Sequence, residues 1–367
     1  MKIFITGGAG FIASHFIKEI YNNVLDPKVL VYDNLHPQVH GKGAKPQFRY
    51  PVDFVLGDVR DSDLLLKTVG EFDPDIIVHL ASETGTGQSL DEIVRYTEVN
   101  VTGTAALLSA IGKLPRRARK FLLSSSRSIY GEGPYIRPDG SRASAPDRSL
   151  ERMAQGDFGV VDFDGVSVSP VAANNKAFAQ PRSVYASTKL AQEHLLQNCS
   201  GAMSLIPIIL RFQNVYGPGQ SLHNPYTGVL SIFSQQALSG KTLNIYEDGK
   251  IIRDFVFVED VARAMMSAVQ KLDSSVEPID IGSGIPVQIL DVARLLLEFL
   301  GRDANSTYIS GNFRPGDIRA AWADISRAEA LLGWRPQVKL EEGLRQFAEW
   351  ARDEIEAAAR AADCAVS

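Results

Sequence analysis

The stretch Tyr185-Ala-Ser-Thr-Lys189 places a phenol and an ammonium group four residues apart. The surrounding residues predict a helix over Ser183–Gln197, and side chains four residues apart on a helix share one face. A lysine beside a tyrosine favours the phenolate, so we expect the pKa of the phenol to move from about 10 toward neutrality. Tyr185 is therefore a candidate general base for an alcohol. The same spacing is common between exposed neighbours on a surface helix, so the interpretation depends on a cofactor site.

A glycine-rich turn at the start of the chain predicts such a site. Residues 6–13 (TGGAGFIA) directly follow an apolar strand and open a helix. Glycines there permit a tight turn and let backbone N–H groups approach a pyrophosphate at a helix N-terminus. Asp33 ends the next predicted strand, where a carboxylate can accept hydrogen bonds from both ribose hydroxyls of an adenosine. Its charge would repel a 2′-phosphate, so the sequence favours NAD over NADP; the alternative is that Asp33 only caps a strand end.

Further residues at strand ends are expected to line the same cofactor site. Asp58 is a candidate adenine contact, and Leu80 and Ala81 end the fourth strand on the path to the nicotinamide. The residues expected to bind NAD are Gly7, Gly10, Phe11, Ile12, Asp33, Asn34, Asp58, Val59, Leu80, Ala81, Ser82, Asn100, Ser124, Tyr185 and Lys189.

The elements that must position these residues alternate between short apolar strands and amphipathic helices. This order predicts an α/β protein with a Rossmann-type, doubly wound parallel sheet whose strands are buried on both faces. The predicted strands are Lys2–Thr6, Val29–Asp33, Phe54–Gly57, Ile76–Leu80, Phe121–Ser125 and Ile206–Phe212. The predicted helices are Phe11–Tyr21, Asp61–Val69, Asp91–Ile111 and Ser183–Gln197.

Two later regions depart from this alternation. Residues 131–181 are rich in Gly, Pro, Asp and Ser, and we interpret them as a surface insertion, with a small hairpin around Val160–Val168. A loop this long is often a lid or an oligomer contact. We expect an NAD-binding domain over residues 1–216 and a smaller C-terminal α/β substrate-binding lobe over 217–367, with about 254–290 returning to the first domain. A C-terminal helix with Leu344, Phe347, Ala351 and Ile355 on one face is expected to pack on the body.

Composition excludes several classes of function. The chain has 367 residues, 22% of them charged, and a net charge of −5, which gives no reason to expect a nucleic-acid partner. The basic run Lys113–Lys120 is interpreted as a solvated connection. Cys199 and Cys364 have neither disulfide nor metal-ligand spacing, so we expect no metal site. The longest apolar runs are too short to cross a bilayer, and we expect a cytoplasmic protein without a membrane partner.

Taken together, four features resemble one known family. The TGGAGFIA turn, the Ser124-Ser125-Ser126 strand end, the Tyr185/Lys189 pair and Arg253-Asp254-Phe255 are similar to the extended short-chain dehydrogenase/reductases that act on nucleotide sugars. The resemblance covers nearly the whole chain apart from 131–181. It implies a catalytic triad of Ser126, Tyr185 and Lys189, and it implies that Asn100 braces the active-site backbone. Ala13 replaces the usual third glycine, and its small side chain still permits close helix–strand packing.

The residues after Ser126 distinguish between the reactions of this family. Nucleotide-sugar 4,6-dehydratases have an Asp and a Glu at the two positions after this serine to eliminate water, whereas this chain has Arg127 and Ser128. Without an acid to protonate a leaving hydroxyl, dehydration is disfavoured. Epimerisation requires only the tyrosine base, the serine and bound NAD.

The resemblance also implies a site for a nucleotide-diphosphate sugar. Asn214 matches a contact to the sugar–pyrophosphate linkage, and Arg253 and Arg314 match contacts to the diphosphate and ribose, for which the planar guanidinium fork is suited. The expected substrate-binding residues are Thr84, Ser126, Arg127, Asn214, Thr227, Arg253, Arg314 and Asp317.

Residues 83–89, 126–132 and 219–228 look most like those of bacterial dTDP-L-rhamnose 4-epimerases, which make dTDP-6-deoxy-L-talose. This favours a dTDP-sugar over a UDP-sugar. The family also implies a homodimer formed by the long helices near Asp91–Ile111 and Ser183–Gln197. The alternatives are a UDP-hexose 4-epimerase, a nucleotide-sugar dehydrogenase, dehydratase or reductase, and a non-catalytic NAD-binding sensor or scaffold.

Overall fold

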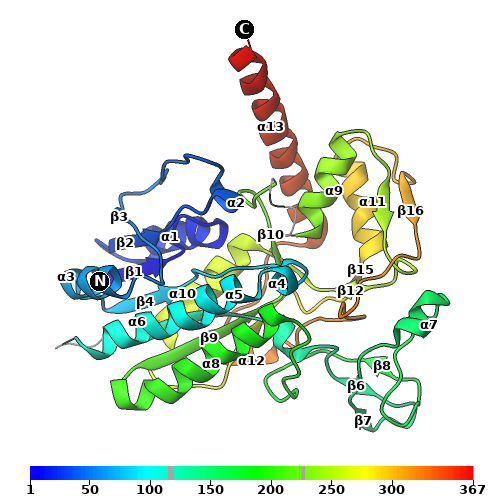
Figure 1. Cartoon of the computed structure of the whole chain (residues 1–367), viewed down its shortest axis with the longest axis horizontal. Coiled ribbons are helices and arrows are strands. Elements are labelled where there is room, and N and C mark those ends of the chain that lie inside the picture. Colours follow the sequence, from blue (N-terminus) through cyan, green and yellow to red (C-terminus); the bar gives the residue numbers. More distant parts are fainter. Residues whose placement is uncertain (115–119, 223, 225–227, 367) are drawn as a thin grey trace.

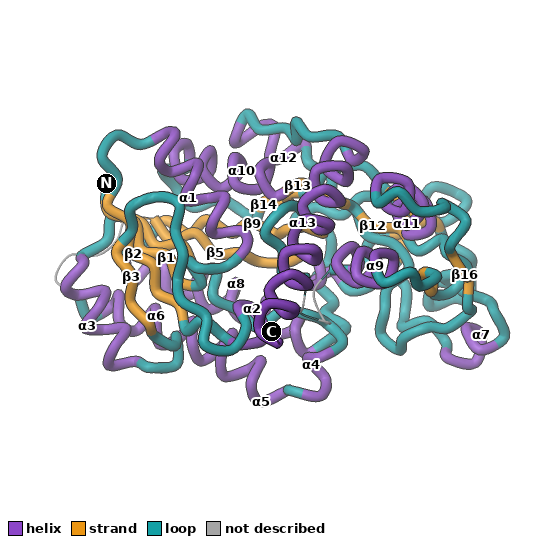
Figure 2. Tube along the Cα trace, turned by 90° about the horizontal axis from the view of Figure 1, so that it is seen from above, coloured by secondary structure: helices purple, strands orange, loops and turns teal. Residues whose placement is uncertain are grey.

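The computed structural model describes residues 1–114, 120–222, 224 and 228–366 and consists of a large body built on one sheet and a smaller lobe (Figures 1 and 2). All pairings in the sheet are parallel, and the strand order is β14-β9-β5-β4-β1-β2-β3. Its strands are β1 (Lys2–Thr6), β2 (Lys28–Asp33), β3 (Asp53–Leu56), β4 (Ile76–His79), β5 (Lys120–Ser126), β9 (Ile206–Phe212) and β14 (Ile279–Ile281). The predicted doubly wound sheet is confirmed, and the winding reverses between β1 and β4.

Strand β1 illustrates why both faces of the sheet are covered. Successive side chains point to opposite faces, so Ile3 and Ile5 enter one core cluster while Phe4 enters the other, and all three are fully buried. Figure 2 shows helices on both sides of the sheet. One cluster is closed by α1 (Phe11–Asn23), α10 (Val258–Lys271) and α12 (Ser326–Leu332), and the other by α3 (Ser62–Phe72), α6 (Gly103–Gly112) and α8 (Val184–Met203).

The helix predicted over Asp91–Ile111 is not continuous. The segment is divided into α4 (Gln88–Asp91), α5 (Ile93–Tyr96), the π-helix η1 (Thr97–Thr102) and α6. Helical spacing of apolar residues cannot reveal a wider turn, because a π segment keeps the chain helical while adding one residue per turn. In this turn Asn100 is fully buried. The expectation of a single long helix was therefore wrong at this point.

The smaller lobe has its own core, built from helices on short strands. Its elements are β10 (Asn214–Tyr216), α9 (Val229–Leu238), β11 (Leu243–Ile245), β12 (Ile252–Arg253), β13 (Phe255–Phe257), β15 (Val287–Gln288), α11 (Ile289–Phe299), β16 (Thr307–Ile309) and α13 (Leu340–Val366). Leu344, Phe347 and Ala351 are fully buried in this core and Ile355 packs against it, so the predicted apolar face of the C-terminal helix packs on the rest of the chain, within the lobe. Beyond these residues α13 projects away from the molecule (Figure 1). Two elements that lie between α9 and α13 in the sequence are not part of the lobe: α10 packs on the main sheet, and β14 is one of its strands.

The segment 131–181 is folded. It contains β6 (Tyr135–Ile136), β7 (Arg142–Ala143), β8 (Ser169–Pro170) and α7 (Leu150–Ala154), and its strands form a three-stranded sheet in the order β7-β6-β8. An antiparallel bridge between Val161 and Ser167 lies inside the predicted hairpin. Tyr135, Ala145 and Val160 form a small core of their own. Figure 1 shows this segment beside the lobe, at the lower right.

Among the described residues, no helix is both long and apolar enough to span a bilayer. Within the same ranges, no group of three or more His, Cys, Asp or Glu side chains is placed to hold a metal ion. Cys199 is a free thiol. Most of the basic run Lys113–Lys120 lies outside the described residues.

Candidate functional site

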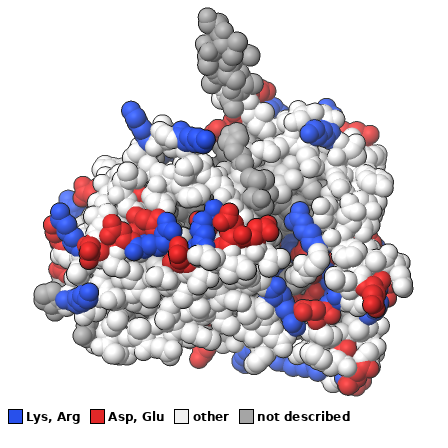
Figure 3. Space-filling model, viewed as in Figure 1, with Lys and Arg blue, Asp and Glu red and all other residues white. Residues whose placement is uncertain are grey.

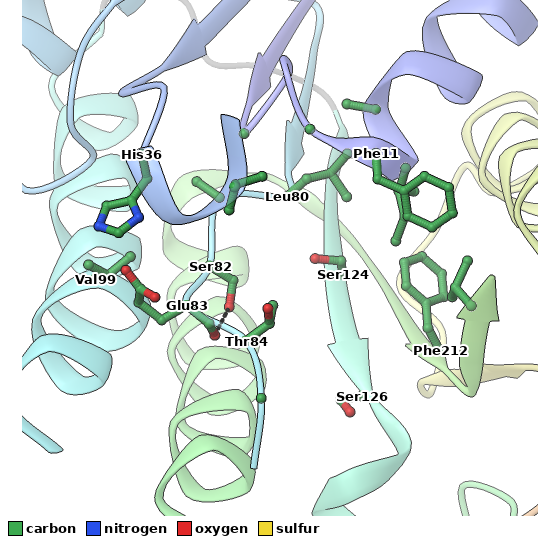
Figure 4. Close-up of a pocket in the computed structure, with 18 of the residues that line it drawn as sticks. Phe11, His36, Leu80, Ser82, Glu83, Thr84, Val99, Ser124, Ser126 and Phe212 are labelled. Carbon is green, nitrogen blue, oxygen red and sulfur yellow. Dashed lines mark hydrogen bonds between the residues drawn. The ribbon is translucent and has the colours of Figure 1, made fainter. Parts of the chain in front are cut away.

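A cleft of about 500 Å³ opens at the carboxyl ends of β1, β2, β4 and β5. This is the edge of the sheet where the winding reverses, which is the usual place for a ligand in an open α/β fold. Figure 4 shows Ser124 and Ser126 on β5 across from Leu80 and the segment Ser82–Thr84, with Phe11 and Phe212 at one end.

The glycine turn is built so that backbone approaches backbone. Gly7 has φ +68°, and a Cβ placed there would lie 2.6 Å from the backbone nitrogen of Ala81. A Cβ on Gly8 would lie 2.7 Å from the side chain of Val31. Gly10 is the N-cap of α1 and brings no side chain to the first N–H groups of the helix, which face the cleft. The turn therefore fits a pyrophosphate at the N-terminus of α1.

Asp33 lies on the wall of the cleft and also holds the turn in place. Its carboxylate accepts hydrogen bonds from the backbone N–H groups of Ala9 at 3.0 Å and Leu35 at 2.8 Å. Both interpretations of Asp33 made from the sequence thus have a structural counterpart, because the side chain caps the local backbone and still borders the space where a ribose would lie.

Asp58 lies behind the wall of the cleft, whereas its neighbours Gly57 and Val59 line it. The Asp58 carboxylate accepts hydrogen bonds from Arg60 at 2.9 Å and from the Asn34 amide at 3.0 Å. The hydrogen bonds from Arg60, with that from Asn34, lower the pKa of Asp58 to about 2. Asp58 therefore orients Asn34, which does line the cleft.

Ser126, Tyr185 and Lys189 meet in the cleft, although β5 and α8 are far apart in the sequence. Helix α8 starts behind Ser183, whose hydroxyl accepts the N–H of Ala186 at 3.1 Å, so Tyr185 and Lys189 occupy its first two turns. Ser126 lies close enough to the Tyr185 phenol to lower its pKa. Lys189 is 2% exposed.

The electrostatics of the pair differ from the expectation drawn from the sequence. Burial raises the pKa of Tyr185 above its ordinary value, and the hydrogen bond from Ser126 and the charge of Arg127 only partly oppose this. Burial also lowers the pKa of Lys189 to about 7, against the nearby charge of Glu193. The expected move of the phenol toward neutrality was therefore wrong for the protein's own residues, because desolvation outweighs charge attraction. Among the described residues, Arg127 is the cation whose charge lowers the pKa of Tyr185.

Asn100 connects the cleft to α8 from behind. Its side-chain oxygen accepts hydrogen bonds from the Ser82 hydroxyl at 3.0 Å and the Glu83 N–H at 2.8 Å, while its amide donates to the Thr188 hydroxyl at 2.9 Å. Thr188 in turn donates to the carbonyl of Tyr185 at 2.8 Å. The buried π turn thus ties the loop after β4 to the first turn of α8.

The residues expected to bind NAD are brought together. All of them line the cleft except Asp58 and Asn100, which support it from behind. Those lining it are Gly7, Gly10, Phe11, Ile12, Asp33, Asn34, Val59, Leu80, Ala81, Ser82, Ser124, Tyr185 and Lys189.

The residues expected to bind substrate divide into two groups. Thr84, Ser126, Arg127 and Asn214 line the cleft. Arg253, Arg314 and Asp317 lie outside that lining, with the Arg253 guanidinium donating to the Asp317 carboxylate at 2.7 Å and Arg314 lying over the Tyr246 ring at 5.0 Å. Burial and the neighbouring charge of Arg253 lower the pKa of Arg127, so the two cations are close. Thr227 lies outside the described residues.

Several polar residues of the cleft were missed from the sequence. The amide of Gln38, in α2 (Pro37–His40), donates to Asn224 at 3.0 Å and to Gln88 at 2.8 Å. These bonds join the turn after β2 to the segment after β10 across the cleft. The missed lining residues include His36, Gln38, His40, Glu83, Phe212, Gln213, Gln220, Ser221 and Asn224. Glu83, Gln220, Ser221 and Asn224 lie in the segments 83–89 and 219–228 that carry the family resemblance, whereas His36, Gln38 and His40 lie in no segment that the sequence analysis singled out.

Comparison with known proteins agrees with this geometry. The model of the NAD dependent epimerase/dehydratase family matches residues 3–151 and 167–282. The dTDP-L-rhamnose 4-epimerase of Burkholderia thailandensis is 40% identical over 356 residues, which cover 97% of this chain and 96% of that protein. The UDP-glucuronic acid 4-epimerase of Bacillus cereus, solved with UDP-glucuronic acid and NAD, has a TM-score of 0.78 at 27% identity and covers 96% of this chain and 99% of its own.

The UDP-glucose 4-epimerase of Thermotoga maritima, solved with UDP-glucose, has a TM-score of 0.76 at 29% identity, covering 97% of this chain and all of its own. The family model omits only residues 152–166 of the segment 131–181, so the part of that segment outside the resemblance is narrower than predicted. With the glycine turn, Asp33 and the Ser126/Tyr185/Lys189 group in one cleft, the chain belongs to the NAD dependent epimerase/dehydratase family.

Proposed function

We propose that this protein is an NAD-dependent 4-epimerase of a nucleotide-diphosphate sugar, and that it interconverts dTDP-L-rhamnose and dTDP-6-deoxy-L-talose. The observation that carries the proposal is that Ser126, Arg127 and Tyr185 line one end of a cleft whose other end fits a dinucleotide. The choice of sugar and nucleotide is supported by the 40% identity to the Burkholderia thailandensis dTDP-L-rhamnose 4-epimerase.

In this proposal bound NAD supplies a reversible hydride acceptor next to C4 of the sugar. Tyr185, as the phenolate, removes the proton from the C4 hydroxyl as C4 becomes a ketone. The 4-keto sugar then rotates in the pocket, and Tyr185 returns the proton when hydride is added to the other face of C4. Ser126 holds the C4 oxygen by a hydrogen bond throughout. Lys189, with a pKa of about 7, is available in both charge states near neutral pH and supports the phenolate when protonated.

The residues around the reacting position argue against loss of water. Arg127 and Ser128 follow Ser126, and the Ser128 hydroxyl and N–H both donate to the Ser126 oxygen, at 3.0 and 3.2 Å. Glu83 is a carboxylate that lines the cleft, but it forms an ion pair with Arg95 at 3.4 Å. Epimerisation asks only for a base that takes and returns one proton.

The proposal is tested with the purified protein and dTDP-L-rhamnose, without added cofactor, by following the anomeric protons by NMR. We expect an equilibrium mixture of two C4 epimers and no net formation of NADH. A product lighter by one water, or steady accumulation of NADH, would contradict the reaction type. Turnover of UDP-glucose but not of dTDP-L-rhamnose would keep the mechanism and replace the substrate.

We further propose that the protein is a homodimer through the outer face of α6 and α8, next to α4 and α5. Leu90, Ile93 and Val94 beside this face are 71%, 50% and 69% exposed. The side chains that α6 and α8 expose are uncharged or histidine: Ala105, Ser109, Ser187, His194, Gln197, Asn198 and Ala202. Figure 3 shows the corresponding area, at the lower left, as largely free of Lys, Arg, Asp and Glu. Such a face is suited to a second copy.

Light scattering during size exclusion tests this assembly. We expect a mass of twice 40.1 kDa for the natural protein and a monomer for Val94→Asp, since a buried unpaired charge opposes association. The matched control is Val166→Asp, at another exposed valine (38% exposed) in the segment 131–181. A dimer that survives Val94→Asp unchanged would rule out this face.

A further inference from the structure

Arg148 in the segment 131–181 has an unusual position for a loop arginine. Its side chain is 3% exposed, and its guanidinium reaches three partners at once. The Nε atom lies 3.0 Å from the Glu132 carboxylate, and Nη1 and Nη2 donate to the two Glu247 oxygens at 2.9 and 2.8 Å. Nη2 also donates to the backbone carbonyl of Asp317 at 2.6 Å. One side chain thus joins this segment to two separate parts of the lobe.

Asp317 is the residue that holds Arg253. Its Oδ1 atom accepts from the Arg253 guanidinium at 2.7 Å and from the N–H of Ile318 at 2.9 Å. Arg253 is only 6% exposed and lies close enough to Arg127 to lower its pKa. Arg148 therefore fixes the backbone from which Asp317 directs Arg253 toward the wall of the cleft that contains Arg127.

The backbone after Asp317 is held from two sides. On one side β12 bonds to it, through the Ile252 N–H to the Arg319 carbonyl at 2.9 Å and the Ala321 N–H to the Ile252 carbonyl at 3.1 Å. On the other side Ala173 of the segment 131–181 bonds to Trp322 and Asp324, both at 2.8 Å. The segment 131–181 is thus attached at several points, among them Arg148 and Ala173, to the stretch that positions Arg253.

Pairing of buried charges fixes the positions of the two carboxylates and the arginines around Arg148. Glu132 and Glu247 are 5% and 1% exposed, and Arg319 donates to Glu247 at 2.8 Å and through its backbone to Glu132 at 3.0 Å. Buried charges are tolerated only when each is paired, and pairing fixes their relative positions. A planar guanidinium can serve three acceptors in fixed directions, which a lysine ammonium on a flexible stem does not reproduce.

We propose that Arg148 is a positioning residue for the nucleotide-diphosphate clamp: by holding Asp317 it orients Arg253 beside Arg127, and the segment 131–181 is a brace for the substrate site. The inference rests on the proposed function in taking the ligand to be a nucleoside diphosphate. It replaces the expectations of a lid or an oligomer contact with a fixed structural role that acts on substrate affinity.

The test is the affinity of the full-length, NAD-loaded protein for dTDP and UDP, measured by calorimetry in natural protein and in Arg148→Met. We expect about tenfold weaker binding of the preferred nucleotide by Arg148→Met, with NAD content unchanged. In the epimerase assay the KM for the nucleotide sugar should rise by a similar factor, with kcat within about twofold, because Tyr185 and Ser126 are untouched. Arg152→Met is the matched control, since Arg152 lies in the same segment but pairs at the surface with Asp157.

Two further variants keep the test decisive if Arg148→Met folds poorly. Arg148→Lys retains a charge between Glu132 and Glu247 but cannot also bind the Asp317 carbonyl in the same geometry, and we expect intermediate affinity. In a double-mutant cycle, Asp317→Asn should remove most of the effect of a change at Arg148, because both act on Arg253. Natural affinity in a folded Arg148→Met or in Arg148→Lys, or an equal loss in Arg152→Met, would overturn the inference.

Nucleotide binding is measured without turnover, so the two proposals fail separately. Weaker dTDP binding by Arg148→Met in a protein that epimerises no sugar would keep the brace and remove the proposed reaction. If the natural protein is an active epimerase and Arg148→Met binds dTDP with unchanged affinity, the proposed reaction stands and the brace is removed.

Discussion

The two ends of the site are held by different kinds of interaction. The cofactor side, comprising the ends of β1, β2, β4 and β5 and the start of α8, is positioned by backbone geometry and strand register. The clamp side, comprising Arg148, Glu247, Arg253, Asp317 and Arg319, is positioned by ion pairs between segments distant in the chain. On the cofactor side, an added side-chain atom would clash with the closely approaching backbone. On the clamp side, a change in the charge or shape of a side chain would break the ion pairs. Substitutions on the two sides should therefore fail in different ways.

The largest expected effect is on the cofactor side, at the base itself. Tyr185→Phe removes the phenolic proton acceptor and leaves the ring in its place, so we expect kcat to fall by about 10²–10⁴. NAD content and dTDP affinity should remain near those of the natural protein. Single-turnover kinetics with calorimetry would check this, and activity retained by the variant would remove Tyr185 from the role of base.

The next effect tests whether the glycine turn depends on close backbone approach. Gly7→Ala places a Cβ 2.6 Å from the Ala81 nitrogen at φ +68°, and the left-handed conformation alone costs about 1–2 kcal/mol. We expect the variant to lose NAD during purification, as measured by absorbance of the released nucleotide. Gly156→Ala is the matched control, because Gly156 also has a positive φ (+81°) but its Cβ would enter open space. Equal loss of NAD from both variants would mean that left-handed backbone strain in general, and not the contact with Ala81, causes the loss.

An intermediate effect links the two sides through Arg127. This guanidinium lowers the pKa of Tyr185 against the larger raising effect of burial. In Arg127→Gln the pKa of Tyr185 should therefore be higher, and because the base acts deprotonated, the rise of kcat/KM with pH should move to higher pH. The factor by which activity is lost should stay constant while the pH is below both pKa values, and it should shrink as the pH rises through the pKa of Tyr185 in the natural protein. A pH profile of unchanged shape would assign Arg127 to substrate binding alone.

The smallest effect is expected at Asp58, whose ion pair with Arg60 is partly exposed to solvent. The folded-state pKa of Asp58 is lowered to about 2, compared with about 3.9 in an unfolded chain. Its contribution is therefore present above pH 4 and is lost as the pH falls through 2. Because solvent screens the pair, Asp58→Asn should cost about 1 kcal/mol or less at pH 7. Urea unfolding at pH 7 and pH 3 would measure it, and a larger cost at pH 3 would contradict the assignment.

The same contrast explains what the sequence could predict. Six of the seven strands of the main sheet, all except β14, lie within one residue of their predicted bounds, because buried parallel strands read as short apolar runs. The glycine turn and the Tyr185–Lys189 spacing are local patterns, and they were placed in the cleft as expected. The π turn at Asn100 was missed because it leaves apolar spacing almost unchanged.

Contacts on the clamp side, and the contact of Gln38 across the cleft, were less predictable because they join residues that are distant in the sequence. Arg148 and Asp317 are 169 residues apart, and Gln38 and Asn224 are 186 apart. Composition suggested only a polar loop around Arg148, and polarity does not show which carboxylates an arginine will meet. The direction of the Tyr185 pKa shift depended on burial, which a two-residue spacing cannot reveal.

The double role of Asp33 has a consequence for engineering cofactor preference. Its carboxylate borders the ribose end of the cleft and also accepts the N–H of Ala9 within the glycine turn. Replacing it with a small neutral residue to admit a 2′-phosphate would release that N–H and loosen the loop that cradles the pyrophosphate. A switch to NADP therefore requires a second change that restores the acceptor for Ala9, and preference and turn rigidity must be redesigned together.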